Sequence, residues 1–355
     1  MSSIAIGRAS SPGRTTALST RSAKLLIGLG CLAIAALIPG HLESNFQFTA
    51  ALAVIWAIAI LSLVVLTGYV GQISLCQATF VGVSAYTVSM LVVNYKVAFP
   101  LAALCGVAVS FVLGVIVGLP ALRLRGILLA IVTVGVALVF DGYFFQDQNY
   151  AWWSGGLNGW TFPGVSVLGY QMDSFHNVLH TYWVLLGLFA ILALLVVNLH
   201  DSGSGRRFRA IRDSEVAAAT MGVNLTRYKL LAFGISAAIA GVGGAFVGPA
   251  LGSVSASIFS LFYSLPFAAF AVLMGVRFVP AAALGGIFMA MVPAVLQHFF
   301  PGIRYDWFNL GLGLLLILQM IIAPDGVWGN LARDAGRMGH LVGMARPKPK
   351  PKVAA

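Results

Sequence analysis

The sequence predicts an all-α integral membrane protein, and three observations support this fold class. Of the 355 residues, 59% are hydrophobic and only 9% are Asp, Glu, Lys or Arg, against about 25% charged residues in a typical soluble domain. Stretches such as residues 48–66 are apolar on every helical face and are long enough to cross the hydrocarbon core of a bilayer. The remaining charges gather between these stretches and at the two ends of the chain.

Ten apolar segments can be marked along the chain as helices that cross or enter a bilayer. The third segment is the most polar, so we expect it to face other helices or a water-filled path, or to span only part of the bilayer. The segments lie at about residues 24–39, 48–66, 72–93, 98–119, 126–145, 181–199, 229–251, 258–275, 279–299 and 307–323.

The basic residues predict how the chain is oriented. With a cytoplasmic N-terminus, ten alternating segments place 19 of the 21 Lys and Arg residues inside and leave only Lys96 and Arg304 outside. Cytoplasmic loops of membrane proteins are enriched in Lys and Arg. This asymmetry therefore selects a topology with both termini in the cytoplasm, and it assigns the net charge of +11 to membrane orientation rather than to nucleic-acid binding.

The topology divides the chain into three parts. Residues 1–23 are a basic cytoplasmic tail, residues 24–323 are the transmembrane domain, and residues 324–355 are a second basic cytoplasmic tail. Within the transmembrane domain, residues 146–180 are expected outside and residues 200–228 in the cytoplasm. The basic start mimics a signal peptide, but no A-x-A cleavage site follows the first apolar segment, so we expect an uncleaved anchor.

Ten crossings divide into two sets of five, and an odd number makes the two halves antiparallel. This is the geometry of inverted-repeat transporters. The count alone carries this expectation, because the sequence shows no clear internal repeat.

Polar side chains on the third segment are candidates for a translocation path. Gln72, Ser74, Gln77 and Thr79 carry amides and hydroxyls that could hydrogen-bond a passing zwitterion or amide without holding it tightly. The alternative is hydrogen bonding between helices, which contributes about 0.6 kcal/mol on average within membranes. Asn158, in the external sequence SGGLNG, is a candidate for an outer gate, although Gly and Asn are also common turn formers.

The basic cytoplasmic stretch contains a predicted two-turn helix. Asp213 or Ser214 can cap its N-terminus, Glu215 suits its positive first turn, and Gly222 followed by Asn224 can end it. A helix with small alanines on its surface can lie in a groove of a partner protein and push on the membrane segments beside it. The alternative is an ordinary basic connecting loop.

Five longer motifs follow one another between residues 66 and 329. They are LTGYVGQISLCQATFVGVSAYT (66–87), RLRGILLAIVTVGVALVF (123–140), SGGLNG (154–159), GRRFRAIRDSEVAAATMGVNLTRYKLLAF (205–233) and PDGVWG (324–329). In this order they resemble the signatures of the M-type subunit of the branched-chain amino-acid permease family of ABC transporters, which also includes urea and short-chain amide permeases.

The fourth motif also resembles the coupling loop of ABC importer permeases, in which Glu, paired Ala and a later Gly recur. The matching positions are Glu215, Ala217, Ala218 and Gly222, and Arg209 lies in the same basic stretch. The resemblance implies that these residues meet an ATPase subunit.

The resemblance implies a type II-like importer permease in the bacterial inner membrane. The solute would be small and hydrophilic, a branched-chain amino acid first and urea or a short-chain amide as alternatives. The implied partners are a second, related permease subunit, two ATP-binding cassette subunits and a solute-binding protein. The chain has no G-x-x-x-x-G-K-[ST] loop to hold nucleotide phosphates, so we expect no enzymatic activity and no cofactor.

Two positions depart from the family pattern. The loop between the eighth and ninth segments reads MGVRFVPAA, with Arg277 and Pro280 where a Gly-rich turn is usual, and Cys76 stands where Gly is usual. We expect the first departure to alter how this turn meets the cytoplasmic partners.

Two other classes of protein compete with this hypothesis, an ion-driven secondary transporter and a non-conducting membrane anchor. Ion-coupled transporters usually keep Asp, Glu or His at mid-membrane. Here Asp141, His298 and Asp306 all lie near segment ends, where interfacial or capping roles are the simpler interpretation. Energy for a transport cycle would therefore have to enter from another polypeptide.

Overall fold

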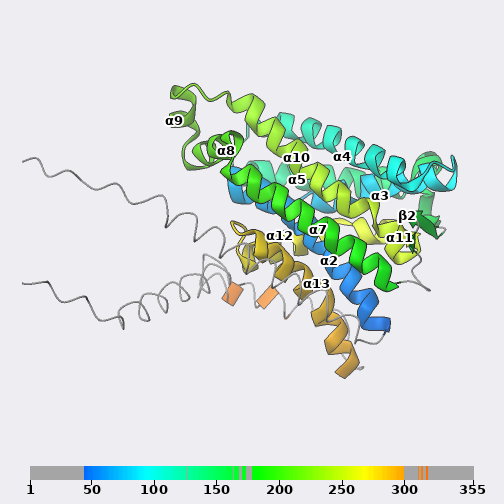
Figure 1. The fold of residues 1–355 in the computed structure, drawn as a ribbon. Coiled ribbons are helices and arrows are strands. Elements are labelled where there is room, and N and C mark those ends of the chain that lie inside the picture. Colours follow the sequence, from blue (N-terminus) through cyan, green and yellow to red (C-terminus); the bar gives the residue numbers. More distant parts are fainter. Residues whose placement is uncertain are drawn as a thin grey trace, which may run out of the picture. The chain divides into compact units, whose positions relative to one another are not determined.

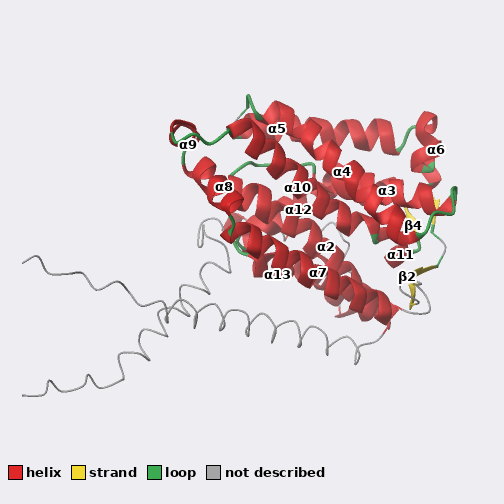
Figure 2. Ribbon diagram, turned by 45° about the horizontal axis from the view of Figure 1, so that its top comes forward, coloured by secondary structure: helices red, strands yellow, loops and turns green. Residues whose placement is uncertain are grey.

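The computed structural model describes residues 44–124, 126–162, 164–167, 170–172 and 178–299, with a few residues between 311 and 318. These parts of the chain are mostly helical, with short strands at one end (Figure 2). The first predicted segment, most of the tenth, and both terminal tails lie outside the described residues.

Six helical spans in the described part are long and apolar enough to cross a membrane. Three of them continue from an α-helix into a second helical element. The six are α2 (Ser44–Leu63) with the π-helix η2 (Val64–Tyr69), α4 (Phe99–Ala121), α5 (Ile127–Val139) with the π-helix η3 (Phe140–Phe145), α7 (Val178–Asp201), α10 (Leu225–Ala245) with α11 (Val247–Leu251), and α13 (Val279–Phe299).

Two further apolar helices are shorter, α3 (Gln77–Val93) and α12 (Leu261–Met274). They correspond to the third and eighth predicted segments. The all-helical membrane fold is thus confirmed for the described residues, whereas ten crossings and inverted repeats stay predictions.

The start of the third segment was predicted wrongly. Residues 71–76 are not helical, and α3 begins only at Gln77. Side chains from outside the segment bond to the backbone here: the N–H of Leu75, in the break, donates to Thr133 Oγ1 (3.0 Å), and that of Ala78, in the first turn of α3, donates to Ser264 Oγ (3.1 Å). Gly71, at φ +77°, starts the break in a left-handed conformation that other residues rarely adopt.

The centre of the bundle is built from α2, α3 and α10, whose residues are mostly buried, while α4, α5, α7 and α13 expose most of theirs. Close approach of the helices requires glycine at the contacts. A Cβ at Gly244 of α10 would collide with the carbonyl oxygen of Val81 on α3, and one at Gly286 of α13 with that of Ala53 on α2. Small residues at helix contacts are characteristic of membrane bundles.

Short elements lie at the two opposite ends of the bundle (Figure 1). One end carries α8 (Gly203–Asp213) and α9 (Glu215–Thr220), within the predicted cytoplasmic stretch. The other end carries most of the predicted external loop, where β1 (Trp160–Thr161) pairs antiparallel with β4 (Ser253–Val254). The remaining short elements there are η4 (Gln148–Tyr150), α6 (Ala151–Ser154), η5 (Gly156–Asn158), the antiparallel pair β2 (Val165–Val167) and β3 (Tyr170–Met172), and η6 (Ala256–Phe259).

Candidate coupling site and polar path

The predicted two-turn helix is present as α9, and local sequence explains both of its ends. Ser214, in an extended conformation, caps the N-terminus by accepting a hydrogen bond from the backbone N–H of Ala217 (3.2 Å). At the other end, Gly222 has φ +80°, its N–H donates to Ala219 O, and the N–H of Val223 donates to Ala218 O. This is the Schellman arrangement that ends many helices at glycine.

Asn224 has a different role from the predicted one. Instead of ending α9, it begins α10, because its side-chain oxygen accepts the N–H of Arg227 (3.0 Å). The short α9 therefore lies between two capped helix starts, its own at Ser214 and that of α10 at Asn224.

The outer surface of α9 is apolar. Val216 is 67% exposed and Met221 84% exposed, and Ala217 is exposed between them. Of the two paired alanines, only Ala217 faces outward, since Ala218 is buried against the rest of the protein. Exposed apolar side chains on a short polar-flanked helix form a surface suited to contact with another protein.

Glu215, at the first turn of α9, points inward. Its carboxylate lies 2.8 Å from the ammonium of Lys229, and Lys229 is buried, with its side chain 2% exposed against 12% for that of Glu215. The same oxygen, Oε1, accepts a hydrogen bond from Nε2 of Gln72 (3.4 Å). The structure thus joins Glu215, predicted for coupling, with Gln72, predicted for the path.

Lys229 was missed as a functional residue. In the sequence it counts only as one more cytoplasmic cation near the start of an apolar helix. A signal was nevertheless present, because a Lys followed directly by Leu230, Leu231, Ala232 and Phe233 must either reach water or find a partner.

Arg212, at the end of α8, also reaches the break before α3. Its Nη1 donates to the carbonyl oxygen of Gly68 (2.7 Å), and a Cβ at Gly71 would lie only 2.8 Å from its Cγ. Burial and the nearby charge of Arg277 lower the pKa of Arg212 from its ordinary value, while Asp213 raises it. A guanidinium remains protonated despite such a shift.

The loop MGVRFVP, which departs from the family pattern, lies next to Gly68 and Arg212. A Cβ on Gly68 would collide with the carbonyl oxygen of Val276, so this loop packs directly against the end of η2. Arg277 adds its charge to that of Arg212. The departure from the family pattern therefore falls next to the coupling stretch.

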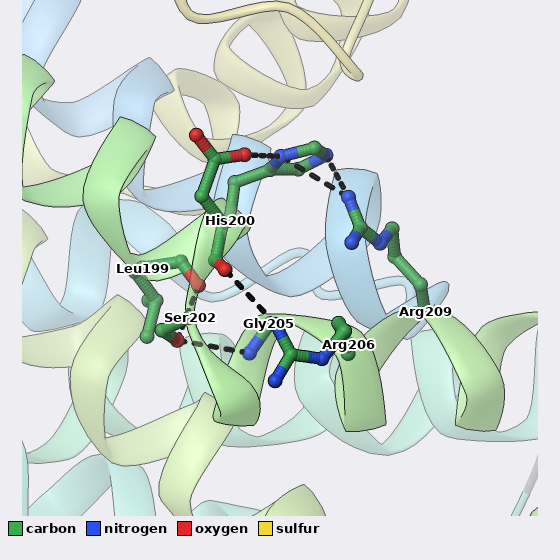
Figure 3. A network of polar contacts seen from close by, with 7 residues as sticks. Leu199, His200, Ser202, Gly205, Arg206 and Arg209 are labelled. Atoms are coloured by element: carbon green, nitrogen blue, oxygen red, sulfur yellow. Dashed lines mark hydrogen bonds and ion pairs between the residues drawn. The ribbon is translucent and has the colours of Figure 1, made fainter. Parts of the chain in front are cut away.

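Arg209 connects α8 to the end of α7 by a hydrogen bond to His200 (Figure 3). Its Nη1 lies 2.6 Å from Nε2 of the His200 ring, and Nδ1 of that ring lies 3.0 Å from the carboxylate of Asp201. The ring also packs on Tyr69, with centroids 5.0 Å apart. Ser202 caps α8 by accepting the N–H of Gly205. Arg209 thus contacts its own chain, and its contact with an ATPase subunit stays a prediction.

Gln77 takes part in hydrogen bonding between helices. Its Oε1 accepts from Ser62 Oγ (2.9 Å), its Nε2 donates to Ser236 Oγ (3.4 Å), and Ser236 in turn donates to the carbonyl oxygen of Ser62. All three residues are fully buried, and they tie α2, α3 and α10 together. The alternative interpretation made from the sequence is the one that the structure shows for this side chain.

The other predicted path residues do not form one group. Gln72, Ser74 and Thr79 are buried along the break and the start of α3, and Ser74 Oγ lies 3.4 Å from the sulfur of Cys76. Asn158 is exposed on η5 at the opposite end of α3. Among the described residues, no three His, Cys, Asp or Glu side chains gather to hold a metal ion.

The opposite end of α3 is covered by aromatic rings. Tyr86 packs against Phe145, Trp153 and Phe259, with ring centroids 5.0, 5.6 and 5.6 Å away. The indole N–H of Trp153 donates to Thr87 Oγ1 (3.3 Å). Through Trp153, the predicted external loop therefore rests on α3.

The polar residues near segment ends have structural partners. The carboxylate of Asp141 accepts the side-chain amide of Gln146 (2.9 Å) and the backbone N–H of Leu261 (3.2 Å), at the start of α12. His298 packs its ring against Phe46 and Phe299. Asp306 lies outside the described residues. The capping interpretation is thus confirmed for Asp141.

Comparison with known proteins decides the family. The family model described as branched-chain amino acid transport system / permease component matches residues 45–320. The chain belongs to this family. The permease is 31% identical over 335 residues to the high-affinity branched-chain amino acid transport system permease protein LivM of Salmonella typhimurium, and equally to that of Escherichia coli, covering 87% of this chain and 76% of each relative.

A second relative is LivH of Escherichia coli, described as a permease protein of the same transport system. It is 28% identical over 171 residues, which are 48% of this chain and 54% of LivH. No solved structure matches the permease significantly.

Family membership fixes the class of function. The chain is a permease subunit of an ABC importer, a multi-pass inner-membrane protein that is not an enzyme, and ATP hydrolysis takes place in separate subunits. This decides against the ion-driven transporter and the non-conducting anchor considered from the sequence. The resemblance to the M-type subunit is confirmed by the match to LivM along most of the chain.

Proposed function

We propose that this permease imports a branched-chain amino acid, together with a second permease subunit, two ATP-binding cassette subunits and a solute-binding protein. The relatives LivM and LivH are both named as permease proteins of branched-chain amino acid transport systems, which supports this solute class. Urea and short-chain amides are the alternatives that the test below separates.

The observation that carries the proposed coupling to ATPase subunits is the outward surface of α9. Val216, Ala217 and Met221 form an apolar ridge at the end of the bundle where the basic α8 also lies. An ATPase subunit that closes on this ridge can push or pull α9, and with it the start of α10. Gly222 ends the helix and keeps the ridge short. We assign docking to this ridge, and we assign Arg209 to holding α8 in place.

The proposal includes the predicted topology. Both termini, α8 and α9 face the cytoplasm, the chain crosses the membrane ten times, and two antiparallel sets of five segments alternate the pathway between outward and inward openings. Most basic residues then lie where the positive-inside rule places them.

We place the polar path along the break between η2 and α3. Transporters commonly bind solutes where a membrane helix is interrupted, because unwound backbone offers polar groups at membrane depth. Residues 71–76 are such an interruption, Gln72 and Ser74 lie in it, and Thr79 lies in the first turn of α3 that follows. In this proposal Gln77 does not line the path but stabilises it, because its hydrogen bonds hold α2 and α10 against α3. Asn158 is assigned to the outer gate.

Reconstitution tests the solute. The complete importer is placed in proteoliposomes with ATP inside and the solute-binding protein outside, and uptake of radiolabelled leucine, urea and acetamide is compared. We expect ATP-dependent leucine uptake that unlabelled isoleucine and valine inhibit. Uptake of urea or acetamide without leucine uptake would replace the proposed solute class.

Docking is tested with a matched pair of variants. Met221→Asp puts a charge into the ridge, whereas Thr226→Asp puts the same charge on an exposed position in the first turn of α10, where a carboxylate is favourable. We expect Met221→Asp to lower the co-purification of the ATPase subunits at least tenfold and Thr226→Asp to leave it unchanged. Equal co-purification in both variants would remove α9 as the docking helix.

A further inference from the structure

Two side chains from the junction of α8 and α9 form hydrogen bonds to residues 68–72, where η2 ends and the helix break begins. Arg212 donates to the carbonyl oxygen of Gly68 (2.7 Å), and Glu215 accepts from Nε2 of Gln72 (3.4 Å). Lys229 holds the Glu215 carboxylate from the start of α10 (2.8 Å). We call these five residues the elbow clamp.

The elbow clamp is tightly built. Lys229 is 2% exposed, and a buried ammonium is strongly destabilised without a paired anion. No side chain fits between the two parts at Gly71, where a Cβ would lie 2.8 Å from Arg212 Cγ. Gly68 is covered from another side by the carbonyl of Val276. The junction of α8 and α9 therefore cannot shift without moving the chain around Gly68 to Gln72.

The piece that is gripped is itself compact. The N–H of Gln72 donates to Leu66 O (3.2 Å), the N–H of Gly71 to Thr67 O (3.2 Å), and the hydroxyl of Thr67 to Gln72 O (3.0 Å). These bonds fold the end of the π-helix η2 into one unit with the break. π-helical turns within membrane helices frequently mark functional positions.

From this unit the connection continues into the centre of the bundle. Along the chain, η2 continues α2, which carries Ser62, and the break leads into α3, which starts at Gln77. The buried hydrogen bonds among Ser62, Gln77 and Ser236 join α2, α3 and α10. A displacement of the elbow clamp thus reaches the helices along which we placed the polar path.

We propose that Glu215 is a positioning residue inside the permease, which transmits the movement of α9 to the helix break through Lys229 and Gln72 and does not contact the ATPase itself. The inference rests on the proposed coupling role of α9. It assigns docking and transmission to different faces of the same helix, with Val216 and Met221 outward and Glu215 inward.

A charge reversal tests the pairing. In the complete importer, Glu215→Gln and Lys229→Met are each expected to lower the number of solute molecules moved per ATP at least tenfold, with the ATPase subunits still bound. The double variant Glu215→Lys with Lys229→Glu restores the pair with its charges exchanged, and we expect it to recover at least a third of the wild-type ratio. Arg206→Gln, at an exposed position of α8, serves as the control and should match the wild type.

Gln72→Met supplies a test that leaves the buried ion pair intact. It removes the side-chain amide of Gln72 and with it the hydrogen bond to Glu215, and we expect a several-fold lower ratio of transport to ATP hydrolysis with normal assembly. This variant also decides the matter if a charge variant fails to assemble.

Two results would overturn the proposal. One is a normal transport ratio in Lys229→Met together with loss of ATPase binding in Glu215→Gln, because Glu215 would then act on the partner. The other is a normal ratio in Gln72→Met. Failure of the docking proposal gives a different pattern, in which Met221→Asp binds the ATPase normally while the clamp variants still lose coupling.

Discussion

The two ends of α3 are held in different ways. Before its N-terminus, charges and hydrogen bonds connect the helix break to α8, α9 and α10 through Arg212, Glu215 and Lys229. In its C-terminal half, Tyr86 packs among aromatic rings of the external loop and neighbouring elements. Hydrogen bonds weaken steeply away from their preferred geometry, whereas the hydrophobic burial of the rings is non-directional. The charged end of α3 is therefore suited to follow a movement of α8 and α9. The aromatic end is suited to keep α3 covered during that movement.

The largest effect is expected for Glu215→Arg at the charged end. This change puts a second cation beside buried Lys229, and leaving one partner of a buried ion pair unpaired costs about 3–5 kcal/mol. We expect loss of coupled uptake and a lower free energy of unfolding, measured by chemical denaturation in detergent. Uptake and stability like those of the wild type would show that the pair does not hold α9.

Phe145→Ala is the corresponding change at the aromatic end. Phe145 is fully buried against Tyr86, and truncation of a buried Phe costs about 3–5 kcal/mol. We expect lower thermal stability but an unchanged ratio of transport to ATP hydrolysis in the protein that remains folded. A lower ratio would mean that the aromatic end also transmits movement, and the comparison of the two ends would fail.

Gly222→Ala tests the end of α9 with a smaller effect. At φ +80° a Cβ is disfavoured, and the left-handed conformation costs a non-glycine residue about 1–2 kcal/mol, while no neighbouring atom lies within reach of the added methyl group. We expect weaker ATPase binding in a co-purification assay with little change in global stability. Gly203→Ala, at a glycine with a negative φ and similar space, is the matched control.

The smallest effect is expected for Tyr86→Phe. The hydroxyl of Tyr86 is buried and has no hydrogen-bond partner in the structure, and an unpaired buried polar group costs about 1–3 kcal/mol. Its removal should leave the rings in place and keep or slightly raise the melting temperature in detergent. A clear drop in melting temperature would show that the hydroxyl is bonded in the membrane.

The sequence predicts features that depend on local chemistry. Apolar length marks the spans, and α9 begins at Ser214 and ends at Gly222 because a capping hydroxyl and a left-handed glycine act on adjacent backbone groups. The basic stretch and the external loop, likewise, are found at opposite ends of the bundle, as the alternation of segments requires.

Contacts between residues that are far apart in the sequence could not be predicted from local chemistry. The pairing of Glu215 with Lys229, and the bonds of Gln77 to Ser62 and Ser236, join residues from separate elements. The helix break before Gln77 was missed because a hydroxyl of α5 takes the backbone N–H of Leu75 and a hydroxyl of α12 takes that of Ala78 just after the break, although Gly71 gave a hint of the break.

The central claim is that α8 and α9 lie in the cytoplasm, where an ATPase can reach them, and it can be tested by cysteine labelling from each side. Met221→Cys and Asn158→Cys are made separately in a background where native Cys105, which is exposed, is Ser. A membrane-impermeant maleimide should label Asn158→Cys in spheroplasts and Met221→Cys only in inside-out vesicles. Labelling of Met221→Cys in intact spheroplasts would contradict the account.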